Sequence, residues 1–250
     1  MGAKRRRRSK SATIYLPIAA LLILFLTVYG TSVFLKINSI EVIGITKYTS
    51  AEIIAASGIS AGENLMLVDT LGAQRRICSA LPYISEAKVT RSMPDTILIE
   101  VSESAPIAAI EHRGAVVIID SSGKVLQHMS FIPSQLIEIK GFEPADAFEG
   151  SIVRPGVDSE TKFNHMVAVL AAIEGAGIQS KVNYLDVTNI ANISICYMDN
   201  FRVLIGGPID VQYKMDLLPG KVEEILTEAP DVGPGMLNMS REPWRWEPDR

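Results

Sequence analysis

Three serines in this chain stand three residues before a lysine, the Ser-x-x-Lys spacing in which a lysine can serve a serine nucleophile. The pairs are Ser85 with Lys88, Ser121 with Lys124, and Ser159 with Lys162. Only Ser159 could open a helix, as that nucleophile requires, and there it also fits an ordinary helix N-cap. The companion sequences Ser-Asp-Asn and Lys-Thr-Gly are absent, so we expect no catalysis at these serines.

Other residue types offer no stronger chemistry. The two cysteines, Cys78 and Cys196, are far apart, and we expect two buried free thiols. His112, His128 and His165 are scattered without metal-ligand spacing, and we expect them on the surface. No glycine-rich phosphate loop is present. The sequence therefore predicts no enzyme, no metal and no cofactor.

The first 35 residues combine a basic cluster with a long apolar segment. Six Lys and Arg side chains precede an uncharged run that ends at Leu35. A helix needs roughly 20 apolar residues to cross the bilayer core, so residues 14–35 are long enough. We predict a transmembrane helix there, with the basic tail 1–13 in the cytoplasm. A cleaved signal peptide is the alternative, but its apolar region would be shorter, roughly 7–15 residues.

Charge is divided unevenly around this segment. All 28 Asp and Glu residues follow Leu35, whereas only 18 of the 24 Lys and Arg residues do. An acidic surface repels phosphate groups, so we expect no nucleic-acid partner. The basic cluster is explained by its role in membrane orientation, which places the bulk of the chain outside the cytoplasm.

After the predicted anchor, hydrophobic periodicity predicts the order strand, helix, helix, strand, strand. The strands are expected at 37–43, 84–91 and 96–101, and the helices at 50–57 and 70–81. Thr49 with Glu52 is a capping-box signal for the first helix. We assign these elements to a first domain, residues 36–105.

Residues 106–240 predict a second, mostly β domain. Strands are expected at 107–111, 115–119, 124–126, 136–139, 182–187, 193–197, 201–205 and 236–240. Residues 142–155 are expected to be irregular. One helix should begin near Ser159, and another, over 211–225, should kink or break at Pro219. The fold class is α+β, with a mixed, mostly antiparallel second domain and a polar tail, 241–250.

The first domain resembles a POTRA domain. The stretches that carry the resemblance are Ile40–Gly44, Gly62–Leu65, Pro82–Val89 and Arg91–Val101, followed by Glu103 and Pro106. With the basic tail and apolar run before them, they make the chain similar to the FtsQ/DivIB family of bacterial cell division proteins. The similarity continues in the second domain at Ile118–Asp120, Leu185–Asn189, Val203–Gly206, Lys214 and Leu237–Ser240. Ser104 departs from the family, which usually has a basic residue there.

This resemblance implies a non-enzymatic scaffold at the division septum. Its implied partners are FtsB/DivIC-like and FtsL-like bitopic division proteins, bound through the C-terminal region, and indirectly the septal peptidoglycan synthase complex. Two other functions stay open. One is a POTRA-bearing envelope chaperone or translocation component, and the other, disfavoured by the missing catalytic site, is a membrane-anchored cell-wall enzyme.

The last strand, 236–240, is the expected docking edge. An edge strand presents unpaired N–H and C=O groups to which an extended segment can add. Only a proline-interrupted tail follows this strand, so we expect its edge to be free. Alternation places Leu237 and Met239 on one face of this strand and Met236, Asn238 and Ser240 on the other.

Two tryptophans follow that strand. Aromatic side chains dominate binding hot spots, so Trp244 and Trp246 could anchor a partner. They could equally fold back onto the core of their own domain, and the sequence leaves both readings open. In the first domain, residues 37–44 or the hairpin around Pro94 are further docking candidates with weaker support.

Overall fold

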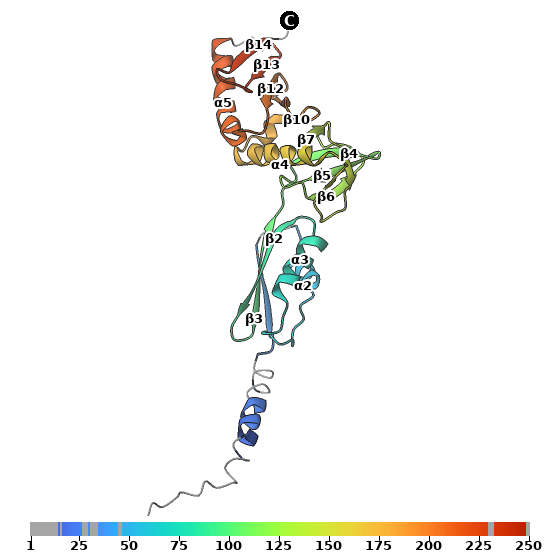
Figure 1. The fold of residues 1–250 in the computed structure, drawn as a ribbon, viewed down its shortest axis with the longest axis vertical. Helices are drawn as coiled ribbons and strands as arrows, with labels where there is room; N and C mark the ends of the chain where they lie inside the picture. The colour runs from blue at the N-terminus through green and yellow to red at the C-terminus, as the bar shows by residue number, and fades with distance from the viewer. Residues whose placement is uncertain are drawn as a thin grey trace, which may run out of the picture. The chain divides into compact units, whose positions relative to one another are not determined.

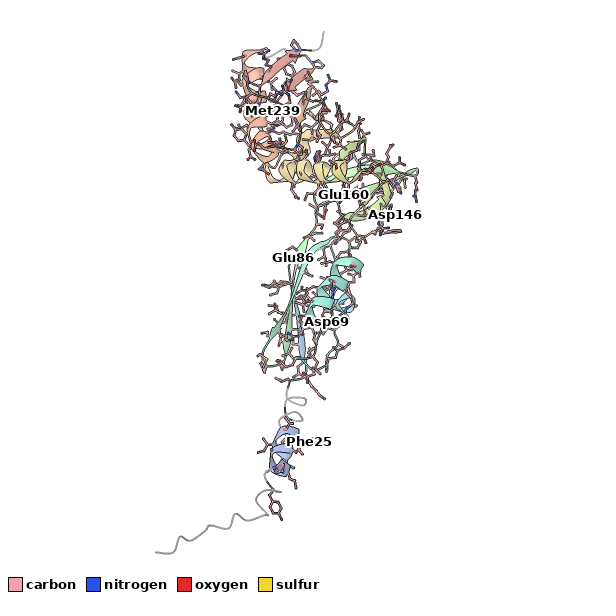
Figure 2. The ribbon with its side chains drawn as sticks, in the orientation of Figure 1. Phe25, Asp69, Glu86, Asp146, Glu160 and Met239 are labelled. Carbon is pink, nitrogen blue, oxygen red and sulfur yellow. The ribbon has the colours of Figure 1, made fainter. Side chains whose placement is uncertain are left out.

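The computed structural model describes residues 15, 17–26, 30, 35–44, 47–229 and 233–248. Residues 17–26 form a helix, on which Phe25 is labelled in Figure 2. Within the described ranges, no helix is both long enough and apolar enough to cross a bilayer. The basic tail and a large part of the predicted span 14–35 lie outside the described residues, so the anchor stays a prediction.

Two compact units make up the chain, and each is described by itself. The first comprises Met1–Ile77 and Glu86–Val101, and the second comprises Cys78–Ser85 and Ser102–Arg250. The short segment 78–85 thus belongs by its contacts to the second unit, although in the sequence it lies between the two stretches of the first.

The predicted element order of the first unit is confirmed. Its elements are β1 (Ser39–Ile43), α2 (Ser50–Ser57), α3 (Thr70–Ala80), β2 (Ile84–Ser92) and β3 (Thr96–Glu103). The sheet order is β1-β3-β2, with β1 parallel to β3. Both helices lie along one face of this sheet (Figure 1). Each helix buries an isoleucine completely, Ile53 on α2 and Ile77 on α3.

Local hydrogen bonds explain where these helices begin. Thr49 and Glu52 form the predicted capping box, in which the Thr49 side chain accepts from the Glu52 N–H and Glu52 accepts from the Thr49 N–H. Asp69, labelled in Figure 2, accepts the Gly72 N–H at 2.9 Å and so caps α3. A Cβ at Gly72 would overlap the Asp69 carboxylate, so a larger residue there would displace the capping side chain.

The second unit is built on one mixed sheet. Its strands are β4 (Ala108–His112), β5 (Ala115–Ile119), β6 (Val125–Met129), β7 (Ile137–Lys140), β10 (Val182–Asp186), β11 (Ile193–Tyr197), β12 (Phe201–Gly206), β13 (Gly235–Asn238) and β14 (Arg245–Pro248). Their order is β14-β13-β12-β11-β10-β7-β4-β5-β6. Five neighbouring pairs are antiparallel and three are parallel, which confirms the predicted mixed, mostly antiparallel sheet.

Two helices cover one face of this sheet, α4 (Glu160–Gly175) and α5 (Val211–Glu228), as Figure 1 shows. They contribute fully buried side chains such as Leu170 and Met215 to the core. On the opposite face only a small cluster around Ile118 is covered, by residues including Ile132 and Leu136. The remaining strands of that face carry a mixture of polar side chains, such as Ser194 and Arg202, and partly exposed apolar ones, Leu204 and Met236.

The structure differs from the sequence expectations for this unit at three points. The segment 142–155 is not wholly irregular, since β8 (Pro144–Asp146) pairs with β9 (Arg154–Pro155). Of the kink or break expected at Pro219, the break does not occur, because α5 is continuous there and Leu218 and Val222 on either side are buried in the core. The tail contains β14, a strand that was not expected from the sequence.

Candidate functional site

The strand predicted to be the docking edge lies inside the sheet. Residues 235–238 form β13, which is parallel to β12 on one side and antiparallel to β14 on the other. The prediction that residues 236–240 present a free edge is therefore wrong. The sequence predicts a polar tail at 241–250, whereas residues 245–248 return along β13 and occupy its outer hydrogen-bonding positions.

The predicted alternation along this strand is confirmed. Leu237 and Met239 are buried, 2% and 0% exposed, and belong to the core beneath the helices. The other three residues of the predicted docking strand, Met236, Asn238 and Ser240, alternate with these two along the chain. Asn238 ends the strand, because its Oδ1 accepts hydrogen bonds from both the N–H and the hydroxyl of Ser240, at 3.0 and 2.6 Å.

Both tryptophans pack against their own domain. The Trp246 ring lies 5.0 Å from the Phe201 ring between centroids, and Trp244 lies 6.1 Å from Tyr213 on α5. Both are half-buried and contact the main hydrophobic cluster. Of the two readings left open by the sequence, folding back onto the core is the one that the structure adopts. Aromatic packing of this kind holds β14 against β13.

Gly235 is needed for that packing. It pairs with Pro248 across β13 and β14, and a Cβ at this position would come within 2.5 Å of the Trp246 ring. Real Cβ atoms do not approach so closely, so the indole lies where a side chain at residue 235 would stand. This glycine carries a signal that sequence reasoning missed, because the partner ring is eleven residues away in the chain.

The outermost strand is β14, and its edge is open within the described residues. Arg245 and Glu247 are exposed on it, and Pro243 and Pro248 stand on either side of them. The opposite edge, β6, is better protected. Val125 on that edge donates to the Ser151 carbonyl and accepts from the Gly150 N–H, both at 2.9 Å. The sheet therefore offers β14 as its more accessible edge.

Two hollows flank this edge. One has a volume of about 680 Å³ and is mainly polar, with Arg241, Arg245, Glu242 and Glu247 among its lining residues. The other, about 530 Å³, lies between α5 and the segment before β14. Its lining residues are Tyr213, Leu217, Lys221, Glu242, Pro243 and Trp244.

An exposed apolar pair on α5 lines the second hollow. Tyr213 and Leu217 are 54% and 39% exposed and stand four residues apart on the helix, and Ile209, 72% exposed, lies just before its first residue. Four-residue spacing places side chains on one face of a helix. This exposed face was not predicted from the sequence, although the same spacing that indicates the buried face also indicates this one.

Lys214 ties the start of α5 to the sheet. Its ammonium donates to the Ile205 carbonyl at 2.8 Å. Burial lowers the pKa of this lysine, and the Asp210 carboxylate opposes that shift in part. Lys214 is one of the positions on which the sequence resemblance rests, and its observed contact is structural.

The three Ser-x-x-Lys pairs are not organised for catalysis. Each lysine has another partner: Lys88 pairs with Glu100, Lys124 donates to two carbonyls, and Lys162 donates to the Gly141 carbonyl. An acylation mechanism needs the lysine within hydrogen-bond reach of its serine.

Ser159 precedes the first residue of α4, but its side chain makes no capping hydrogen bond. With Lys162 it lines an open cavity of about 820 Å³. The serine thus holds the N-cap position suggested by the sequence without the capping bond.

The cysteines and histidines do not assemble into a site. Cys78 and Cys196 are free thiols and are half-buried, less buried than expected. Burial raises the pKa of the Cys196 thiol, and Asp199 adds to the shift, so this thiol is a weak nucleophile. His128 is exposed beside Glu149, whereas the Nδ1 atoms of His112 and His165 are buried. Among the described residues, no His, Cys, Asp or Glu cluster could hold a metal ion.

The fold thus defines a POTRA-like unit joined to a mixed β unit with an open strand edge. A family model described as POTRA domain, FtsQ-type, matches residues 35–104. Cell division protein FtsQ of Corynebacterium glutamicum is 32% identical over 113 residues, which cover 45% of this chain and 50% of that protein. FtsQ of Streptomyces bingchenggensis is 36% identical over 95 residues, which cover 38% of this chain and 36% of that protein.

A longer match extends into the second unit. Cell division protein DivIB of Clostridium botulinum is 26% identical over 214 residues, 85% of this chain and 81% of that protein. The chain spans half or less of the length of these two FtsQ relatives. These matches confirm the resemblance to the FtsQ/DivIB family of cell division proteins that was noted in the sequence.

Proposed function

We propose that this chain is a non-enzymatic scaffold of the bacterial division machinery that binds other membrane-anchored division proteins outside the cytoplasm. The observation that carries the proposal is the FtsQ-type POTRA domain in one chain with a sheet that ends in an open strand. The printed names of its relatives, FtsQ and DivIB, support a division role. Since none of the three Ser-x-x-Lys pairs is organised for acyl transfer, binding is the function that this geometry favours.

The proposal includes a membrane anchor at residues 14–35. The uncharged run of the sequence and the basic residues before it support this anchor. Its N-terminus would be cytoplasmic and both units would stand outside, at the division septum. Tethering matters for binding, because two proteins held in the same membrane meet at a raised effective concentration.

The proposed docking edge is β14, one strand further out than the sequence suggested. An extended partner segment that adds here would pair with the outer backbone groups of residues 245–248. Arg245 and Glu247 place one positive and one negative charge on this short strand, so a partner with complementary charges would be favoured in one register. By family resemblance, the partners are an FtsB/DivIC-like and an FtsL-like bitopic protein, which connect the chain indirectly to septal peptidoglycan synthesis.

Site-specific photocrosslinking in living cells tests this edge. A crosslinker at Arg245 or Glu247 should capture small bitopic division proteins, whereas one at Glu111 on β4 should not, although it is also an exposed strand position. A crosslinker at Leu237 should give no intermolecular product, because this side chain is only 2% exposed.

Two outcomes would contradict the assignment. Partner products from Leu237 with none from Glu247 would mean that β14 detaches and that the partner pairs with β13 instead. Products only with outer-membrane proteins or secreted clients would favour the chaperone or translocation function.

A further inference from the structure

Three exposed apolar side chains gather at one end of the first unit. Met66, Leu67 and Met93 are 55%, 82% and 62% exposed. Their neighbours Leu65 and Val68 are buried, at 0% and 7%. Exposed apolar side chains are ordinary when scattered singly, but three at one end of a small unit indicate a surface that is covered in use.

Hydrogen bonds fix the loop with Met66 and Leu67 to the point where the chain enters the unit. The Leu65 N–H donates to the Leu35 carbonyl at 2.7 Å, and the Ile37 N–H donates to the Glu63 carbonyl at 2.9 Å. Leu35 is also the last residue of the uncharged N-terminal run. The loop therefore adjoins the end of that run directly.

Met93 reaches the same end from a different segment. It lies in the turn between β2 and β3, and Asp95 in this turn accepts the Asn38 backbone N–H at 2.8 Å and its side-chain amide at 2.9 Å. The first residue of β1, Ser39, pairs with Thr96, the first residue of β3. The turn thus lies at the end of the sheet where β1 begins (Figure 1).

Arg91 holds the loop in this orientation. Its guanidinium donates to the Leu65 carbonyl at 2.9 Å and to the Val68 carbonyl at 2.7 Å. With Leu65 and Val68 buried and their carbonyls held, the two residues between them cannot turn into the core. Met66 and Leu67 are held outward by the fold.

Chain geometry places these side chains within reach of a bilayer surface. Consecutive Cα atoms are about 3.8 Å apart, so the Leu67 Cα lies within roughly 8 Å of the Leu65 Cα. The headgroup layer on each side of a bilayer is about 5–8 Å thick. If residue 35 leaves the hydrocarbon core, the loop beside it is at headgroup depth.

We propose that Met66, Leu67 and Met93 form a lipid contact that enters the boundary between headgroups and acyl chains and holds the first unit against the membrane. This inference rests on the proposed anchor at residues 14–35. Burying apolar side chains at that boundary is favourable without any specific lipid. Lys36 lies at this end, but so do the acidic Glu63 and Asp95, so the contact is apolar in character and does not require anionic lipid.

Spin-label accessibility in the full chain tests the contact. In a Cys78→Ser, Cys196→Ser background, a nitroxide would be placed singly at Leu67→Cys, Met93→Cys, Ile43→Cys or Leu22→Cys, and the protein reconstituted in zwitterionic phosphatidylcholine nanodiscs. Ile43 is a matched control, because it is apolar and 55% exposed but stands at the far end of β1. Leu22 reports the anchor itself. Oxygen concentrates in lipid and a nickel complex in water, so their collision rates give the depth of each label.

The labels at Leu67 and Met93 should collide mainly with oxygen, and the label at Ile43 mainly with nickel. If all three are nickel-accessible while the label at Leu22 is shielded, the anchor holds and the lipid contact is wrong. If the label at Leu22 is also nickel-accessible, the anchor itself fails and the lipid contact fails with it. Shielding of Leu67 from both reagents would mean that protein, not lipid, covers this end.

Discussion

At the scale of single residues, Lys124 belongs to a Ser-x-x-Lys pair, a spacing found in some catalytic sites, but its role in this structure is structural. This side chain is 7% exposed, and its ammonium donates to the Cys78 carbonyl at 2.8 Å and to the Ile84 carbonyl at 2.6 Å. Burial lowers its pKa, although Cys78 and Asp120 oppose the shift. The lysine holds residues 78–85 in the second unit.

Replacing Lys124 with methionine should destabilise that unit. The change keeps an unbranched side chain but removes the donors, which leaves two carbonyls without a partner at a cost of ~1–3 kcal/mol each. Chemical denaturation followed by circular dichroism would measure the lower free energy of unfolding. Lys221→Met is the control, because Lys221 is an exposed partner of Glu224 and its loss should cost much less. Equal effects of the two variants would refute this role for Lys124.

Glu52 gives the first helix a pH dependence. The Thr49 hydroxyl and backbone N–H donate to its carboxylate and lower its pKa below the usual 4.5. A carboxyl whose pKa is lower in the folded state stabilises the fold above its unfolded pKa, and that contribution is lost as pH falls through the folded value. Amide hydrogen exchange in α2 should therefore become faster, relative to intrinsic rates, as pH drops below 4.5.

The Glu52→Gln variant is the control for this effect. It keeps an acceptor for the capping bonds but does not titrate, so its α2 protection should change less over the same interval. Unchanged protection in the original chain at low pH would show that the capping box adds little.

At the scale of elements, the β13–β14 pair decides where a partner can bind. Four residues of β14 pair with β13, and the packing of Trp246 on Phe201 and over Gly235 adds to those backbone bonds. Such a short strand has little stability of its own. Its attachment therefore depends on this local packing.

Gly235→Ala should loosen β14 by forcing its methyl group into the Trp246 ring, with an overpacking cost of ~1–3 kcal/mol. Trypsin should then cut faster after Arg241 and Arg245, which mass spectrometry would follow. Gly233→Ala is the matched control, since nothing lies within 4 Å of a Cβ at that position. Cleavage rates that match the control would argue against this role for the glycine.

At the scale of the whole molecule, the proposed function assigns membrane attachment and folding to different parts of the chain. The apolar N-terminal run would hold the chain in the membrane, while the two units have their own buried cores. The acidic excess after residue 35 favours solubility of those units once they are released.

Deletion of residues 1–30 should leave both units folded but free of the membrane. Leu35, whose carbonyl accepts the Leu65 N–H, is retained in this variant. The full chain should stay in the membrane pellet after alkaline carbonate treatment, whereas the shortened chain should appear in the supernatant. The circular dichroism spectrum of the shortened chain should show that both units keep their secondary structure. Extraction of the full chain by carbonate would contradict the anchor.

The two units differ in how much the sequence revealed. Thr49 with Glu52, the Pro82 stop and the alternation of Ile97 and Ile99 are local signals, and each predicted its element correctly. Alternation also predicted which side chains of 236–240 face the core. By contrast, β14 has only four residues, the last of which is Pro248, and these are too few for periodicity to reveal a strand.

The sequence by itself determined the element order of the first unit, the buried and exposed faces of the last predicted strand, and the family resemblance, because these depend on neighbours in the chain. Only the tertiary structure decided that β14 covers β13, that both tryptophans pack inward, and that Met66 and Met93 share one end of a unit. Each of these depends on backbone pairing or packing between residues distant in sequence, which local propensity does not encode.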